Sequence, residues 1–88
     1  MDLTKTIEHL VLEGILIQET KLFLEQYGGH LIFESVGKGD YQLTLSTSTS
    51  ETKERILVKG MPTEVISNYF LYRLHGAMAK LLGEVHPL

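Results

Sequence analysis

Residues 30–47 read HLIFESVGKGDYQLTLST, and this stretch predicts the centre of the fold. Its second half, Tyr41–Thr47, alternates apolar and polar residues with a period of two, as in a strand that buries one face. Its first half, His30–Val36, is β-branched and aromatic, and the GKGD sequence at 37–40 supplies glycines for a tight reversal between the halves. We therefore expect an antiparallel hairpin. Its core-facing side chains should be Tyr41, Leu43 and Leu45, and its outward-facing side chains should be Gln42, Thr44 and Ser46.

The chain after the hairpin predicts a third strand and a second helix. The polar segment Ser48–Glu54 is typical of a loop, and Arg55–Lys59, which reads RILVK, is typical of a strand. The sequence GMP at 60–62 ends that strand, because glycine and proline interrupt regular structure. A helix should follow, opened either by Thr63 or by Met61 with Pro62 in its first turn. It should run to about Leu82, with Gly83 as its C-terminal cap.

The chain before the hairpin predicts a long N-terminal helix. Residues Leu3–Tyr27 are rich in good helix formers and precede a glycine pair, which favours the left-handed conformation that closes a helix. We favour one continuous helix, although its apolar stripe changes face along the length. The stripe of the first half contains Leu3, Ile7, Leu10, Val11 and Ile15, and that of the second half contains Phe23, Leu24 and Tyr27.

Together these elements place residues 1–88 in a single α+β domain of order α-β-β-β-α. Its sheet should be a three-stranded antiparallel meander covered by two helices. The length leaves room for one core, and a hydrophobic fraction of 43% is that of an ordinary globular chain. The chain has no cysteine, so packing or self-association must supply the extra stability that disulfides give to other small domains.

Charge and hydropathy argue against two classes of partner. The formal net charge is −3, and the 8 Lys and Arg residues are scattered singly, whereas nucleic-acid binders cluster positive charge to neutralise phosphates. No window approaches the roughly 18 uninterrupted apolar residues of a membrane span, and the N-terminus lacks the basic segment of a signal peptide. We therefore expect a soluble, cytoplasmic protein that binds neither nucleic acid nor membrane.

The predicted second helix carries two apolar stripes, whereas a surface helix needs only one. One stripe can cover the sheet, and the other needs the N-terminal helix or a second subunit. The second stripe combines two tyrosines, which favour interfaces, with small residues that permit close approach. We interpret it as a homodimer seam; the alternative is that its tyrosines cover the edge of the core within one chain. The core stripe is Ile66, Phe70, Leu74, Ala77 and Leu81, and the predicted interface is Val65, Tyr69, Tyr72, Gly76 and Ala79.

The histidines do not predict a metal site. His9 and Glu13 lie four residues apart on one expected helix and could share a metal, but two ligands do not make a site. We interpret both as surface residues. His30, beside the glycine pair, and His75, inside the second helix, are interpreted as packed or interfacial side chains.

Two further segments contain residue types found in phosphate-binding or phosphorylated sites, but their sequence context does not support either function. The glycines at 37–40 precede a strand rather than a helix, so they indicate a hairpin turn and not a phosphate-binding loop. The hydroxyl-rich segment at 46–52 can accept phosphate, but we interpret it as a strand end that runs into a solvated loop. No nucleophile with an acid–base partner is recognisable, so no catalytic or cofactor site is expected.

The leading hypothesis is a non-enzymatic, self-associating adaptor or regulatory module that docks on a larger protein. It depends on the surplus of apolar surface on the second helix. The alternative is a small-ligand or nucleic-acid-binding regulator that uses the open face of the sheet, with Phe33 or Ile32 and Leu57 in contact with the guest.

Overall fold

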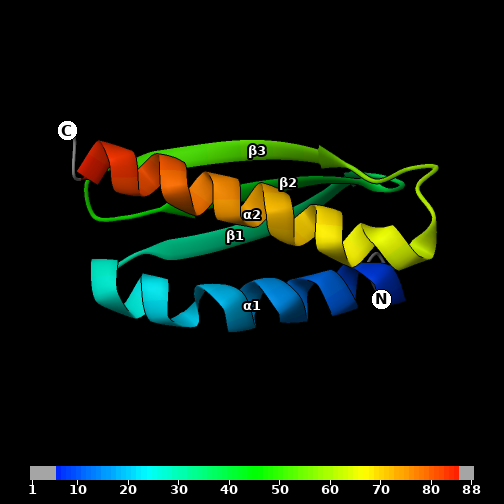
Figure 1. The fold of residues 1–88 in the computed structure, drawn as a ribbon, viewed down its shortest axis with the longest axis horizontal. Helices are drawn as coiled ribbons and strands as arrows, with labels where there is room; N and C mark the ends of the chain where they lie inside the picture. Colours follow the sequence, from blue (N-terminus) through cyan, green and yellow to red (C-terminus); the bar gives the residue numbers. More distant parts are fainter. Residues whose placement is uncertain (1–5, 86–88) are drawn as a thin grey trace, which may run out of the picture.

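The computed structural model describes residues 6–85 and contains, in chain order, a helix, three antiparallel strands and a second helix (Figure 1). This confirms the predicted α+β class and the α-β-β-β-α order. The strands form one sheet of order β1-β2-β3, so β2 is central and both other strands are edges. The elements are α1 (Ile7–Tyr27), β1 (His30–Gly37), β2 (Asp40–Ser46), β3 (Glu51–Leu57) and α2 (Thr63–Val85).

Both helices pack against one face of the sheet, and no element of residues 6–85 covers the other face. Helix α1 contacts β1 and α2, whereas α2 contacts β2 and β3. Tyr41, Leu43 and Leu45 are buried between the layers, which confirms the predicted core-facing side of β2. Tyr41 and Leu43 belong to the main core cluster, and Leu45 belongs to a second cluster with Phe23, Ala77 and Leu81. The other members of the main cluster are Leu12, Leu16, Ile56, Val58, Ile66, Phe70 and Leu74.

One residue on the outward side of β2 is less exposed than the alternation suggests. Gln42 and Ser46 are partly exposed, but Thr44 is only 6% exposed. In the sheet register Thr44 lies between Ile32 of β1 and Lys53 of β3. The longer neighbours on both sides shield a small side chain on the central strand, even on the open face.

Strand β3 begins earlier than predicted. It spans Glu51–Leu57, so the expected loop over Ser48–Glu54 and strand over Arg55–Lys59 are wrong in their bounds. The polar composition of its first half concealed it, because Thr52 and Glu54 occupy positions on the helix-covered face that apolar residues usually fill. Thr52 is nevertheless 4% exposed. A threonine is β-branched and suits a strand in spite of its hydroxyl.

Helix α1 is continuous, as favoured from the sequence. Thr6 caps its start by accepting a hydrogen bond from the His9 backbone N–H at 3.1 Å. Gly28 ends it in the left-handed region with φ 61°, where glycine carries no steric penalty. Its second half packs on the core as predicted, through buried Phe23 and half-buried Leu24 and Tyr27.

The predicted stripe of the first half of α1 does not face the core. Helix α1 is apolar around most of its circumference, so apolar character alone does not select the buried side. The true buried stripe includes two polar residues, and one of them, Thr20, satisfies its hydroxyl by donating to the Leu16 carbonyl at 2.6 Å. The buried residues are His9, Leu12, Leu16, Thr20 and Phe23, whereas Ile7, Leu10 and Val11 are exposed, Ile15 is half-buried and Leu3 lies outside the described residues.

Helix α2 extends past its predicted end. It spans Thr63–Val85, and Gly83 lies within it, so the prediction of a C-terminal cap at Gly83 is wrong. A glycine inside a helix costs only about 1 kcal/mol relative to alanine, which is too little to end a long, well-packed helix. The predicted core stripe is confirmed as buried: Ile66, Phe70, Leu74, Ala77 and Leu81.

Candidate functional site

The predicted interface residues of α2 share one side of the helix but differ in exposure. Val65 and Tyr72 are 42% and 73% exposed, and Gly76 and Ala79 are exposed on the same solvent side. Tyr69 is half-buried and packs against the core cluster. We call these five residues the α2 seam. The structure brings four of them together on the solvent side, and their role in a homodimer stays a prediction.

A hydrogen-bond network holds Tyr69 at the edge of the core. Arg73 donates one hydrogen bond to the Tyr69 hydroxyl at 3.0 Å and another to Glu54 Oε1 at 2.7 Å. Its guanidinium carbon also lies 5.9 Å from the centroid of the Tyr69 ring, within cation–π range. The hydrogen bonds with Glu54 and Tyr69 raise the pKa of Arg73. These hydrogen bonds connect α2 to β3, because Glu54 belongs to that edge strand.

A groove lies between the α2 seam and β3, with a volume of about 490 Å³. Its lining joins members of the seam to a residue of the edge strand. At Gly76 no atom lies within 4 Å of the position that a Cβ would take, so this part of the helix surface is open to a neighbouring chain. The lining residues are Glu54, Tyr72, Arg73, His75 and Gly76.

Strand β3 also contains a buried polar residue, Thr52. It lies on the helix-covered face, opposite Leu45 of β2. Its side chain is buried, yet its Oγ1 has no hydrogen-bond partner within the described part of the chain. Buried polar atoms are hydrogen-bonded in the great majority of cases, so this hydroxyl needs an explanation.

Helix α1 exposes more large apolar side chains than α2 does. They lie on the side opposite its core-facing stripe, and we call them the outer stripe of α1. Single exposed apolar residues are common on protein surfaces, but a group of them along one helix marks a candidate contact surface. Sequence reasoning missed this surface because it placed three of these residues in an apolar stripe without showing which side of the helix the fold would bury. The outer stripe is Ile7, Leu10, Val11, Ile17 and Leu22, with exposures of 81%, 52%, 53%, 58% and 76%.

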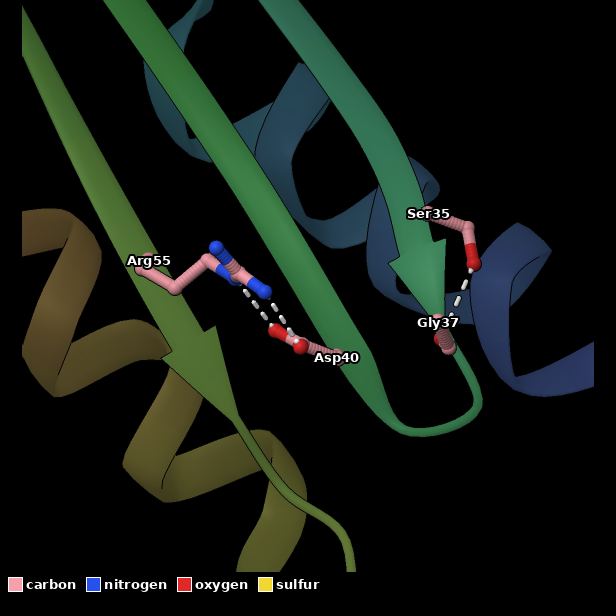
Figure 2. A network of polar contacts seen from close by, with 4 residues as sticks. All are labelled: Ser35, Gly37, Asp40 and Arg55. Atoms are coloured by element: carbon pink, nitrogen blue, oxygen red, sulfur yellow. Dashed lines mark hydrogen bonds and ion pairs between the residues drawn. The ribbon is translucent and has the colours of Figure 1, made fainter.

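An ion pair and a small irregularity flank the β1–β2 turn (Figure 2). Arg55 donates from Nε and Nη2 to the two carboxylate oxygens of Asp40, both at 2.7 Å, which clamps β3 to β2. The hydrogen bond from Arg55 lowers the pKa of Asp40. At the end of β1 the register shifts between Ser35 and Gly37, and Ser35 Oγ donates to the Gly37 carbonyl at 3.2 Å.

A buried aromatic cluster lies beneath the start of α1. His9 is 3% exposed, and its ring centroid lies 4.7 Å from that of Phe33 and 5.7 Å from that of Tyr41. The interpretation of His9 as a surface residue is therefore wrong, because these rings provide a flat packing surface for the imidazole. Burial, together with a hydrogen bond that the Tyr41 hydroxyl donates to Glu8 Oε1 at 2.5 Å, raises the pKa of Tyr41 to about 12.

The other histidines of the described segment lie at the surface. His75 has a 59% exposed side chain, and its Nε2 lies 3.3 Å from Glu19 Oε1, a contact that joins α2 to α1. His30 is exposed at the start of β1. Neither is packed within its own chain, so that part of the interpretation is wrong. Over residues 6–85 no group of three or more His, Asp or Glu side chains could hold a metal ion.

The two loops that the sequence singled out have structural roles. The segment 37–40 closes the β1–β2 hairpin as predicted, with Gly39 in the left-handed region at φ 66°. The Gly39 carbonyl accepts a hydrogen bond from the Val58 N–H at 2.8 Å, which ties the turn to the end of β3. The hydroxyl-rich segment 46–52 runs into β3, so Thr52 is a strand residue and not part of a solvated loop.

The open face of the sheet mixes apolar and charged side chains. Ile32 and Leu57 are 52% and 54% exposed there, as the alternative hypothesis requires. Phe33 instead points towards the helices, where its ring centroid lies 5.4 Å from that of Phe70. Its assignment to a guest on the open face is therefore wrong, since successive strand residues face opposite sides. The register places charges of both signs on the open face: Glu34, Glu51, Lys53 and Arg55.

Comparison of the chain with protein-family models, curated proteins and solved structures finds no match. Neither helix of the described segment is long and apolar enough to cross a membrane. Two surfaces of the domain itself are therefore the candidates for a functional contact: the α2 seam and the outer stripe of α1.

Proposed function

We propose that the protein is a non-enzymatic protein-binding module that associates with a second copy of itself through the α2 seam. We further propose that the outer stripe of α1 docks on a larger protein. The observation that carries the proposal is that each helix has an exposed apolar side in addition to the side that covers the sheet. A helix on the surface of a two-layer monomer needs only one apolar side. The second sides support contacts with other chains.

The size of the domain also favours association. A chain of 88 residues buries a smaller share of its surface than a large domain does. Tyr72, which is 73% exposed, is the largest side chain on the solvent side of the α2 seam. Covering such a ring removes apolar area from water, which contributes roughly 25 cal/mol per Å². A second copy provides that cover without a longer chain.

The polar contacts favour binding over catalysis. Three close pairs each join two elements of the fold, and groups that hold a fold together are poorly placed to act on a substrate. The absence of cysteine suits a reducing compartment, and we propose the cytoplasm as the location. The three pairs are Asp40 with Arg55, Glu54 with Arg73, and Glu8 with Tyr41.

The proposal is tested by placing a charge in the α2 seam. Ala79→Glu should raise the dissociation constant of the homodimer by about tenfold or more, because an unpaired carboxylate is costly to bury. Gln18→Glu is the matched control: it adds the same charge at an exposed position of the other helix and should leave the constant close to that of the parent. Sedimentation equilibrium measures the constants, and circular dichroism confirms that each variant is folded.

Two results would contradict the proposal. A parent protein with the mass of one chain at high micromolar concentration would rule out the self-association. A dimer that tolerates Ala79→Glu as well as it tolerates Gln18→Glu would rule out the α2 seam as its contact.

A further inference from the structure

We infer that the outer stripe of α1 binds an amphipathic helix of a partner protein, and that this helix carries lysine or arginine on both sides of its apolar face. The inference rests on the proposed function and names the chemistry of the larger protein that docks there. Three features of α1 support it: the spacing of its exposed side chains, the hollows beside them and the charge of the helix.

The exposed side of α1 has the spacing of a coiled-coil seam. Six positions follow one another at alternating steps of three and four residues, which is the a/d pattern of the heptad repeat. The first five are exposed and the last is half-buried. Such a row fits one further helix, because each of its side chains enters a gap between side chains of the facing helix. We call it the heptad row of α1: Ile7, Leu10, Gly14, Ile17, Lys21 and Leu24.

The position of α1 in the molecule leaves this row accessible. In Figure 1, α1 forms one long edge of the molecule, and no other element of residues 6–85 lies beyond it. At Gly14, in the middle of the row, no atom lies within 4 Å of the position that a Cβ would take. A helix of similar length can therefore lie along α1 and approach it closely at its centre.

Two hollows lie beside the heptad row, one towards each end. The first, of about 350 Å³, lies between the start of α1 and the start of α2, and Ile7 and Ile66 are among its lining residues. The second, of about 420 Å³, lies between the second half of α1 and the start of β1, with Ile17 and Leu24 in its lining. A heptad row turns around a straight helix by about 20° per heptad, so along α1 it moves away from α2 and towards β1. A helix on this row thus has room for long side chains near both of its ends.

The charge of α1 determines which kind of helix fits. Its sequence contains four glutamates and one lysine. Glu8 lines the first hollow and Glu25 lines the second, so acidic groups lie beside the row at both ends. Complementary charge favours the right partner, and like charge disfavours the wrong one. Lys21 does not reverse this preference, because its stem can cover apolar surface while its ammonium group stays in water.

The same charges argue against two other occupants. A second copy of this chain on the row would bring the glutamates of one α1 close to those of the other, and like charges across an interface are unfavourable. The cytoplasmic surface of a membrane is negatively charged, and helices that lie on it carry lysine and arginine on their polar side. A basic amphipathic helix is the occupant that matches both the apolar row and its acidic surroundings.

The test uses two designed peptides of about three heptads as probes. Both have leucine at positions a and d; the basic peptide has lysine at e and g, and the acidic peptide has glutamate there. Like charges at e and g also keep each peptide from pairing with itself. The basic peptide should bind the protein at least about tenfold more tightly than the acidic one, and its affinity should fall as salt is added. Fluorescence anisotropy of the labelled peptides measures both dissociation constants.

Four variants locate the contact on α1. Ile17→Gln removes an apolar group from the row and should weaken binding of the basic peptide by about tenfold. Ile32→Gln is its matched control, because Ile32 is 52% exposed against 58% for Ile17 but lies on the open face of the sheet; it should leave the constant unchanged. Glu25→Lys should weaken binding of the basic peptide and strengthen that of the acidic one. Glu34→Lys makes the same charge reversal on β1 and should do neither.

The outcomes separate this inference from the proposed function. Equal binding of the two peptides would mean that the outer stripe docks on helices without selecting charge, so the inference would be wrong and the proposed function would stand. If neither peptide binds below about 1 mM, the inference is wrong, and Ala79→Glu still tests self-association independently. If Ile32→Gln weakens binding as much as Ile17→Gln does, α1 is not the contact.

Two further measurements exclude the other occupants. Ile17→Gln should leave the mass of the homodimer unchanged; a loss of the dimer would make the outer stripe a contact between copies and overturn the inference. Vesicles of phosphatidylglycerol and phosphatidylcholine in equal parts should not bind the protein in a sedimentation assay. Binding to these vesicles that Ile17→Gln abolishes would assign the stripe to a membrane surface and overturn the inference as well.

Discussion

Leu43 is the side chain about which the core is arranged. It is fully buried on the central strand, between Phe33 of β1 and Glu54 of β3 in the sheet register. The helices cover it from above through Phe70, which belongs to the same core cluster. A polar group at this position would have neither water nor a hydrogen-bond partner. A polar substitution at Leu43 is therefore a direct test of whether this position is buried in the core.

Leu43→Asp should unfold the domain. An unpaired carboxylate in this position costs several kcal/mol, on the order of the whole stability of a small domain. It would also lie opposite Glu54, so that like charges face each other across β2 and β3. Thermal unfolding followed by circular dichroism checks this. A cooperative transition near the parent melting temperature would mean that Leu43 does not occupy the core.

Tyr41 should make the stability depend on pH in the alkaline range. Burial and the hydrogen bond to Glu8 raise its pKa in the folded protein from 10.0 to about 12. The neutral phenol is thus favoured in the folded state, and its contribution is fully present below pH 10 and lost as the pH rises towards 12. Tyr41→Phe lacks this group, so the stability advantage of the parent over the variant should shrink across that interval. Urea unfolding at several pH values measures the difference; a constant difference would refute the assignment.

Buried polar residues are one group that sequence reasoning did not place correctly. Periodicity identified Tyr41 and Leu43, because their apolar side chains alternate with polar neighbours. It could not identify His9 or Thr20, since residue type alone suggests exposure for both. Their burial depends on neighbours that only the folded chain supplies: aromatic rings around His9 and the Leu16 carbonyl beside Thr20.

At the scale of elements, α2 separates into a side that stabilises the fold and a side that is free for contact. Phe70 and Leu74 are fully buried, and Phe70 packs edge-on against Phe33 and Tyr41. The seam residue Ala79 is exposed on the other side of the same helix. The two sides should therefore respond differently to substitution, one through stability and the other through association.

Phe70→Ala should lower the free energy of unfolding by roughly 3–5 kcal/mol, because it removes a fully buried ring and leaves a cavity. Ala79→Glu should leave the stability of the isolated chain within about 0.5 kcal/mol of the parent, as expected for an exposed helical position. Urea denaturation at a protein concentration below the dimer dissociation constant measures both. Equal losses in the two variants would contradict the assignment of the two sides.

The elements themselves were predictable where their pattern was local. The hairpin and the core stripe of α2 follow from alternation and from helical spacing, and both are confirmed. The start of β3 and the buried side of α1 were not predictable in this way. The first half of β3 is polar and shows no apolar alternation. Helix α1 has two apolar sides, so packing rather than sequence period decides which side is buried. Within the candidate site, the α2 seam was predicted from the sequence, whereas the outer stripe of α1 could be identified only from the exposure of its residues in the folded structure.

For the molecule as a whole, the charge distribution argues against nucleic acid. The formal net charge is −3. Arg55 and Arg73, two of its positive groups, are already engaged by Asp40 and Glu54. A positive group that is paired within the protein releases few counterions when it approaches a phosphate backbone. The open face of the sheet is therefore a poor surface for a polyanion.

We expect no appreciable affinity for single-stranded or duplex DNA or RNA at physiological salt. Fluorescence anisotropy with labelled oligonucleotides of mixed sequence checks this, with a titration of salt to isolate the electrostatic contribution. Submicromolar binding that weakens as salt is added would contradict the expectation. It would favour the alternative of a regulator that uses the open sheet face.

The central claim is that this domain functions as an assembled pair, and the mass of the parent protein in solution tests it most directly. Sedimentation equilibrium over a range from about 1 to about 300 µM covers the dissociation constants expected of a small, partly apolar interface. The account predicts a mass that rises with concentration from one chain to a limit of two. A mass that stays at one chain over the whole range would contradict it.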